Sequence, residues 1–120
     1  MYLTDDLLLA KWQTEFKKGF SKPLILFTLA EIGRSYAFFL TKKILELTNG
    51  EISIAGSNIY PMLSKLEEDN LIVSQLDEND RKFYRLTDSG KKFLEQLEKS
   101  IKDFNEIMLE LIKHKNKGDV

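Results

Sequence analysis

The feature that most constrains this 120-residue chain is a helical apolar stripe followed at once by a hairpin pattern. Apolar residues recur at helical spacing over residues 56–69. The core-facing stripe of this helix consists of Ile59, Leu63 and Leu66. Two short strand-like runs follow at 71–76 and 81–86, joined by the polar turn 77–80. The pattern therefore predicts a helix that leads directly into a two-stranded β-hairpin.

Two helices are expected between residues 21 and 50. Ser21 can cap a helix that is apolar almost all round at 24–32, so this helix should lie buried at the centre. Ser35 can cap the next helix, which ends at Asn49-Gly50, a pair typical of a helix end and turn. The alternation at 52–54 is long enough for one short strand only.

A helix is also expected at each end of the chain. Thr4, followed by two acids, resembles a helix start, and this helix runs to about Lys18. Thr87 caps a last helix that continues to about Lys115, with a tail at 115–120. The fold predicted is mainly α with a small β-hairpin wing, a winged helix-turn-helix. Its expected parts are an N-terminal helix (1–21), a DNA-binding domain (22–90) and a C-terminal dimerisation helix (91–120).

Composition limits the function classes. The chain has no cysteine, which excludes disulfides and thiolate metal sites, and its longest apolar run, 23–30, is too short to cross a bilayer. We expect a cytoplasmic protein with no membrane partner. The net charge of −1 is unusual for a nucleic-acid binder, because phosphate contacts supply much of the affinity. The distribution of charge therefore matters more than its sum.

The helix at 56–69 would enter the major groove of DNA, and the hairpin would lie beside a phosphate strand. Asn58 is the best base-reading candidate, since an amide can pair with adenine N6 and N7. The face opposite the core stripe carries Ser57, Asn58, Pro61, Ser64 and Lys65. Arg81 and Lys82 follow the wing turn, where they can contact phosphates. The acids at 67–69 fall at the far end of the helix, away from the expected DNA.

Two blocks carry a resemblance to a known family. Ile54-Ala55-Gly56-Ser57-Asn58-Ile59-Tyr60-Pro61-Met62-Leu63 begins the first block, which continues to Ile72, and Arg81-Lys82-Phe83-Tyr84-Arg85-Leu86-Thr87 begins the second. Together they resemble the PadR family of transcriptional regulators over about residues 22–94. The resemblance implies a homodimeric repressor on a pseudo-palindromic operator of double-stranded DNA, with Tyr60 near the DNA. Ser57 stands where the family prefers Gly, which could alter how the recognition helix begins.

The last helix carries an apolar stripe, which we call its seam. Its apolar residues alternate in spacings of three and four, as in a coiled coil, and an isolated helix could not bury them. The seam consists of Leu94, Leu97, Ile101, Phe104, Met108 and Leu111. We expect the N-terminal helix to pack beside it through Leu8, Trp12 and Phe16, so that both helices contribute to a dimer interface.

Several alternatives stay open at this point. Tyr60 either wedges against the core with its hydroxyl near a phosphate or reads a base. Trp12 is typical of a helical core stripe, and the alternative is a pocket for a small-molecule effector. His114 has no partners at metal-ligand spacing, and no nucleophile–base pair or Gly-rich phosphate loop is present. We therefore expect neither an enzyme nor a cofactor.

Two other protein classes compete with the DNA-binding regulator. A winged-helix module for protein–protein interaction would explain the lack of overall basicity, and acidic groups around Ser57 and Arg81 would favour it. A winged helix of the MarR type would need longer helices on both sides of the wing domain, for which the chain is too short.

Overall fold

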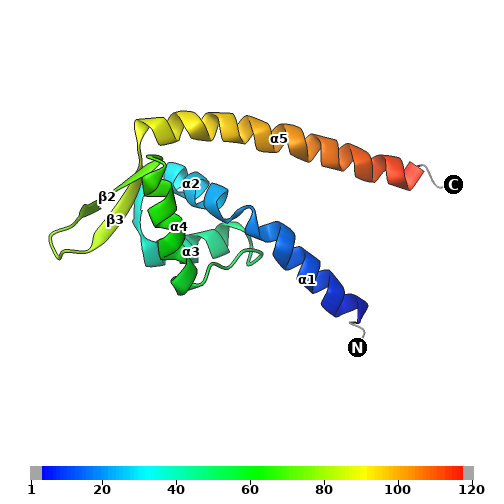
Figure 1. Ribbon diagram of the computed structural model, residues 1–120, viewed down its shortest axis with the longest axis horizontal. Helices are drawn as coiled ribbons and strands as arrows, with labels where there is room; N and C mark the ends of the chain where they lie inside the picture. Colours follow the sequence, from blue (N-terminus) through cyan, green and yellow to red (C-terminus); the bar gives the residue numbers. More distant parts are fainter. Residues whose placement is uncertain (1–3, 118–120) are drawn as a thin grey trace.

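The computed structural model describes residues 4–117 (Figure 1). Helices make up most of this part of the chain, and a small three-stranded sheet completes it. The elements in order are α1 (Asp5–Lys18), α2 (Ser21–Ile32), β1 (Arg34–Tyr36), α3 (Ala37–Leu47), α4 (Gly56–Glu68), β2 (Ile72–Leu76), β3 (Lys82–Leu86) and α5 (Asp88–Lys117). The predicted fold class is confirmed. The expected tail is helical at 115–117, and residues 118–120 lie outside the described part.

The sheet corrects one prediction. Its order is β1-β3-β2 with antiparallel neighbours, and β1 covers residues 34–36, whereas the short strand was expected at 52–54. Residues 52–54 instead form part of an irregular segment in which Ile54 is buried in the core. Ser35 lies opposite Tyr84 in the sheet, so it does not cap α3. A three-residue strand forms here because β3 supplies its hydrogen-bonding partner, which no local pattern can reveal.

The centre of the core is α2, as predicted. Ile25, Leu26 and Leu29 are almost wholly buried, and α2 contacts α3, α5 and the strands β1 and β3. The stripe of α4 also faces the core, since Ile59, Leu63 and Leu66 are buried. Removing each such side chain from water stabilises the fold by roughly 1.5–3 kcal/mol. Ser21, expected as a cap of α2, is instead a buried first residue of this helix, and no side chain caps it.

The junction of α4, the wing and α5 is built around one threonine. Thr87 Oγ1 accepts a hydrogen bond from the Gly90 amide at 2.8 Å and donates to the Asn70 carbonyl at 2.7 Å. Asn70 takes a left-handed conformation at φ 60°, which asparagine tolerates well. Gly90 must stay small, because a Cβ there would collide with the Leu71 carbonyl. These contacts fix the start of α5 against the end of α4.

The two terminal helices leave the domain on the same side and diverge, which gives the molecule extents of 63 × 37 × 23 Å (Figure 1). This arrangement bears on two expectations. Leu94 is buried in the core of its own chain at 5% exposure, and Leu97 packs partly against that core, so neither needs a partner to be covered. Furthermore, α1 buries no residue and is separated from α5 by a hollow. Among residues 4–117, no helix combines the length and the apolar character needed to cross a membrane.

Candidate nucleic-acid interface

The outward face of α4 is open to solvent. Its core stripe turns the opposite side of the helix away from the domain, and Tyr60 is 57% exposed, so it does not wedge into the core. The other exposed residues expected at the DNA are Ser57, Asn58, Pro61, Ser64 and Lys65. Lys65 Nζ lies 3.4 Å from a carboxylate oxygen of Asp69, a surface ion pair that leaves it exposed.

The wing turn is organised by the side chain of Asp77. One of its carboxylate oxygens accepts hydrogen bonds from the backbone amides of Asn79 and Arg81, at 2.8 and 2.9 Å. The other accepts a hydrogen bond of 2.6 Å from the hydroxyl of Tyr36 at the start of α3. Asp77 therefore shapes the turn and ties it to the rest of the domain, although sequence analysis gave it no role.

These hydrogen bonds change the acidity of both partners. The hydrogen bond from the Tyr36 hydroxyl, and after it the one from the Arg81 amide, lower the pKa of Asp77 from 3.8 to about 2. Burial opposes this shift, and the Asn79 amide and the Arg81 charge add to it. The bond between Tyr36 and Asp77 also raises the pKa of Tyr36. The Arg81 guanidinium lies 5.0 Å from the centre of the Tyr36 ring, a cation–π distance that positions the base of the wing.

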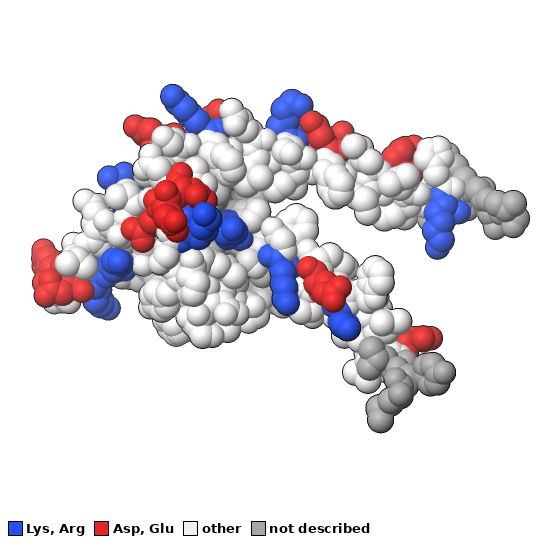
Figure 2. Space-filling model, viewed as in Figure 1, with Lys and Arg blue, Asp and Glu red and all other residues white. Residues whose placement is uncertain are grey.

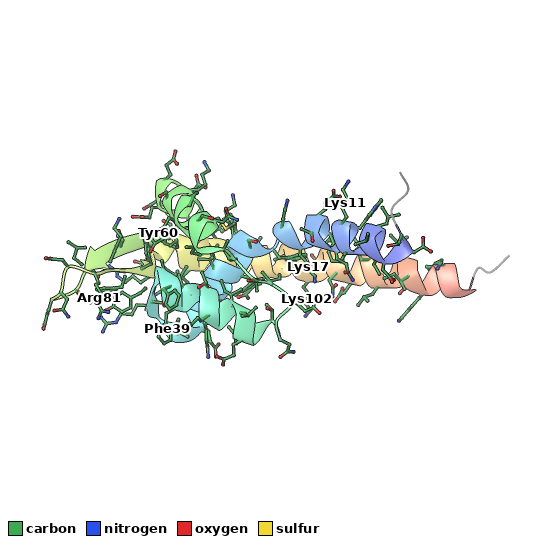
Figure 3. All side chains as sticks on the ribbon, turned by 90° about the horizontal axis from the view of Figure 1, so that it is seen from below. Lys11, Lys17, Phe39, Tyr60, Arg81 and Lys102 are labelled. Carbon is green, nitrogen blue, oxygen red and sulfur yellow. The ribbon has the colours of Figure 1, made fainter. Side chains whose placement is uncertain are left out.

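Residues from β1, α3, α4 and the wing meet in one hollow of about 340 Å³. Tyr60, Arg81 and Lys82, expected at the DNA, line it together. Figure 3 shows Tyr60, Arg81 and Phe39 on the same side of the molecule, each from a different element. Phe38 and Phe39 also line the hollow, and sequence analysis did not single them out.

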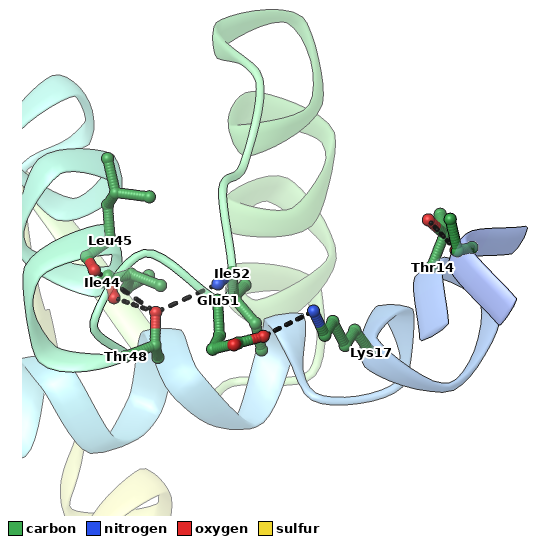
Figure 4. A network of polar contacts seen from close by, with 8 residues as sticks. Thr14, Lys17, Ile44, Leu45, Thr48, Glu51 and Ile52 are labelled. Atoms are coloured by element: carbon green, nitrogen blue, oxygen red, sulfur yellow. Dashed lines mark hydrogen bonds and ion pairs between the residues drawn. The ribbon is translucent and has the colours of Figure 1, made fainter. Parts of the chain in front are cut away.

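Asn58 lies at a second hollow, of about 470 Å³, between the end of α1, residues 51–54 and α4. Lys17 and Lys18 line it as well. Lys17 Nζ donates to Glu51 Oε2 at 2.6 Å, which connects α1 to the segment before α4 (Figure 4). In the same segment the Ile52 amide donates to Thr48 Oγ1 at 3.1 Å. Ser57, Pro61, Ser64 and Lys65 line neither of these two hollows.

Acidic groups gather in two places on one face of the molecule (Figure 2), and Glu51 lines the hollow that contains Asn58. Figure 2 shows one red cluster at the end of the wing and another over the middle of the domain, whereas the lower edge of the domain is white in this view. The wing turn contains Glu78 and Asp80, and the end of α4 carries Glu67, Glu68 and Asp69. The residues that line the hollow beside the wing include two cations and no acid. The lining of this hollow thus carries positive charge although the net charge of the chain is −1, and Asp77 offsets part of it through its ion pair with Arg81.

Comparison with known proteins identifies the family. The model of the transcriptional regulator PadR-like family matches residues 25–96. The chain belongs to this family. As a PadR-like protein it is a transcriptional regulator with a winged-helix DNA-binding fold and not an enzyme, as expected.

Solved structures agree with this assignment. A PadR family transcriptional regulator from Eggerthella lenta is 27% identical, with a TM-score of 0.76 over 89% of this chain and 94% of that one. A transcriptional regulator from Clostridium thermocellum is 26% identical, with a TM-score of 0.73 over 80% and 96%. F93 from STIV, a winged-helix DNA-binding protein, is 28% identical, with a TM-score of 0.59 over 67% and 85%.

The wing contact can be tested through the acidity of Asp77. Because its pKa is lowered on folding, its contribution to stability is complete above pH 3.8 and is lost as the pH falls towards about 2. We expect NMR titration of the Asp77 carboxyl to give a pKa of about 2, and Tyr36→Phe to move it up towards 3.8. Tyr60→Phe, which removes a hydroxyl from α4, should leave it unchanged. If the pKa of Asp77 is the same in the wild type and in Tyr36→Phe, the hydrogen bond between these two residues is absent in solution.

Proposed function

We propose that this PadR-like protein binds a pseudo-palindromic DNA operator as a homodimer and represses transcription, in the cytoplasm where the DNA lies. The observation that carries this proposal is the meeting of Tyr60, Arg81 and Lys82 in one acid-free hollow beside the exposed face of α4. A phosphate strand beside a helix in the major groove can accept hydrogen bonds from a hydroxyl and two cations of this kind.

Within this proposal the residues divide between two tasks. Asn58, in the first turn of α4, pairs with an adenine edge, and Ser57 and Ser64 donate to bases or phosphates. The exposed face of α4 also carries Pro61 and Lys65, the latter near the backbone. Tyr60, Arg81 and Lys82 contact phosphates and fix the register of the protein on the duplex.

The terminal helices support the homodimer. The hollow between α1 and α5, of about 740 Å³, is largely apolar, and Phe16, Ile101, Phe104 and Met108 line it. Leu8 and Trp12 on α1 and Leu111 on α5 are exposed as well. A single chain leaves Ile101 half-buried and the other side chains in water, whereas a second copy that inserts its α5 between α1 and α5 would bury them. A symmetric partner fits because it offers the same unburied helices.

A protein-interaction module is the second candidate, and one observation favours it. Asp77 Oδ2 lies 3.4 Å from Arg81 Nε, and Glu51 lines the hollow that contains Asn58, so acids do stand near both proposed DNA sites. Both carboxylates are engaged within the chain, however, Asp77 by Tyr36 and backbone amides and Glu51 by Lys17. Each carboxylate therefore offsets one cation within the chain, Arg81 or Lys17, whereas Lys82 and Lys18 make no ion pair among residues 4–117.

DNA binding is tested by selecting duplexes from random sequence and measuring affinity by fluorescence anisotropy at several salt concentrations. We expect the affinity of the wild type to fall steeply with salt. Asn58→Ala should relax the preference at one position by about 1–3 kcal/mol, whereas Lys82→Ala should weaken all sequences alike and lower the salt slope by about 1. Lys99→Ala, which removes a cation of α5 far from the wing, is the control. Absence of binding to any duplex would reject DNA recognition and favour the protein-interaction module.

The homodimer is tested by placing a charge in the hollow between α1 and α5. Phe104 is 62% exposed in the single chain, so Phe104→Glu should leave the domain folded. We expect sedimentation to show a dimer for the wild type and a monomer for the variant. Burial of an unpaired carboxylate at an interface has a large unfavourable free energy. The affinity of Phe104→Glu for the operator should fall together with dimerisation. Lys99→Glu makes a similar change on the opposite face of α5 and should stay dimeric; if Phe104→Glu also stays dimeric, the interface lies elsewhere.

A further inference from the structure

Two neighbouring phenylalanines at the start of α3 lie in water. Phe38 is 66% exposed and Phe39 62%, whereas Ala37 before them and Leu40 after them are buried in the core. Helix periodicity allows α3 to bury Ala37, Leu40 and Ile44 on one face, which leaves both phenylalanines outside it. Two large apolar side chains exposed next to each other can mark an interaction surface.

The position of this pair narrows the choice of partner. Phe38 and Phe39 line the hollow of about 340 Å³ together with Tyr60 of α4 and the two cations of the wing. Figure 3 shows Phe39 on the side of the molecule that also carries Tyr60 and Arg81. The phenylalanines thus line the same hollow as the proposed recognition helix and the proposed phosphate-binding wing.

The charges around the pair indicate an anionic partner. Lys42 Nζ lies 4.8 Å from the centre of the Phe38 ring, and Arg34 Cζ lies 5.0 Å from the centre of the Phe83 ring on the neighbouring strand. Arg81 and Lys82 line the hollow beside both rings, and Phe39 lines a second hollow with Arg34, Lys43 and Asp77, so cations outnumber acids around the pair. A partner that fits must carry negative charges at its edges and apolar groups between them.

The DNA backbone has this alternation, because apolar deoxyribose carbons separate its phosphates. We propose that Phe38 and Phe39 pack against deoxyribose groups of the strand that runs between α4 and the wing, while Arg81 and Lys82 contact the flanking phosphates. This inference rests on the proposed function. It adds a component of affinity that comes from apolar burial and therefore does not depend on salt, unlike the contribution of the cations.

The test compares wild type, Phe38→Ala, Phe39→Ala and the double variant on the selected operator duplex across a salt series. We expect the double variant to bind about tenfold more weakly at every salt concentration, with an unchanged salt slope. Leu45→Ala removes an exposed apolar side chain from the other end of the same helix and should bind like the wild type. Lys82→Ala should behave differently, because it should reduce the slope of log affinity against log salt concentration. Thermal unfolding checks that each variant is folded, and Phe39→Leu, which keeps an apolar side chain, should retain most of the affinity.

A second measurement tests the sugar contact itself. Single ribonucleotides are placed at successive positions of the operator, so that each adds one polar 2′-hydroxyl. In the wild type we expect a loss of affinity at a few adjacent positions, and in the double variant we expect that loss to disappear. If the wild type binds the operator and the double variant binds equally well, the inference is overturned and the phenylalanines belong to a protein partner. If the wild type binds no duplex, the proposed function itself fails.

Discussion

The helix α2 presents apolar side chains in every direction, and the rest of the domain is arranged to cover them. Its residues Ile25, Leu26 and Leu29 are almost completely shielded by α3, α5 and the sheet. Because α3 and β3 are held against the same helix, the start of α3 and the base of the wing are brought together. The hollow that collects Tyr60, Arg81 and Lys82 is therefore a consequence of how the core is covered.

The same core sets the limit of what one chain can bury. It covers α5 as far as Leu94 and, in part, Leu97. Beyond this point α5 and α1 extend from the domain with their apolar residues exposed, which is unfavourable in water for a chain that works alone. The stability of the DNA-binding unit and its proposed assembly into pairs thus have one physical origin, the burial of apolar surface.

Local patterns were sufficient for most of the fold. The helical stripe of α4, the hairpin, the left-handed Asn70 and the caps at Thr4 and Thr87 all depend on residues a few positions apart, and the structure contains each of them. Contacts between distant residues were not predictable. The strand at 34–36 exists because β3 pairs with it, and the bond between Tyr36 and Asp77 joins residues 41 positions apart. Sequence periodicity assigned Leu94 to a dimer seam because it cannot tell which apolar residues the chain's own core will cover.

If two copies present their α4 helices to one face of DNA, the distance between these helices must match the spacing of two successive major grooves. The chain has no cysteine, so Ser64→Cys offers a single site for a spin label on the exposed face of α4. Pulsed electron paramagnetic resonance on the labelled protein should give one distance between protomers of roughly 34–36 Å, one turn of DNA. The absence of a distance between protomers, or one far from a DNA turn, would contradict the account.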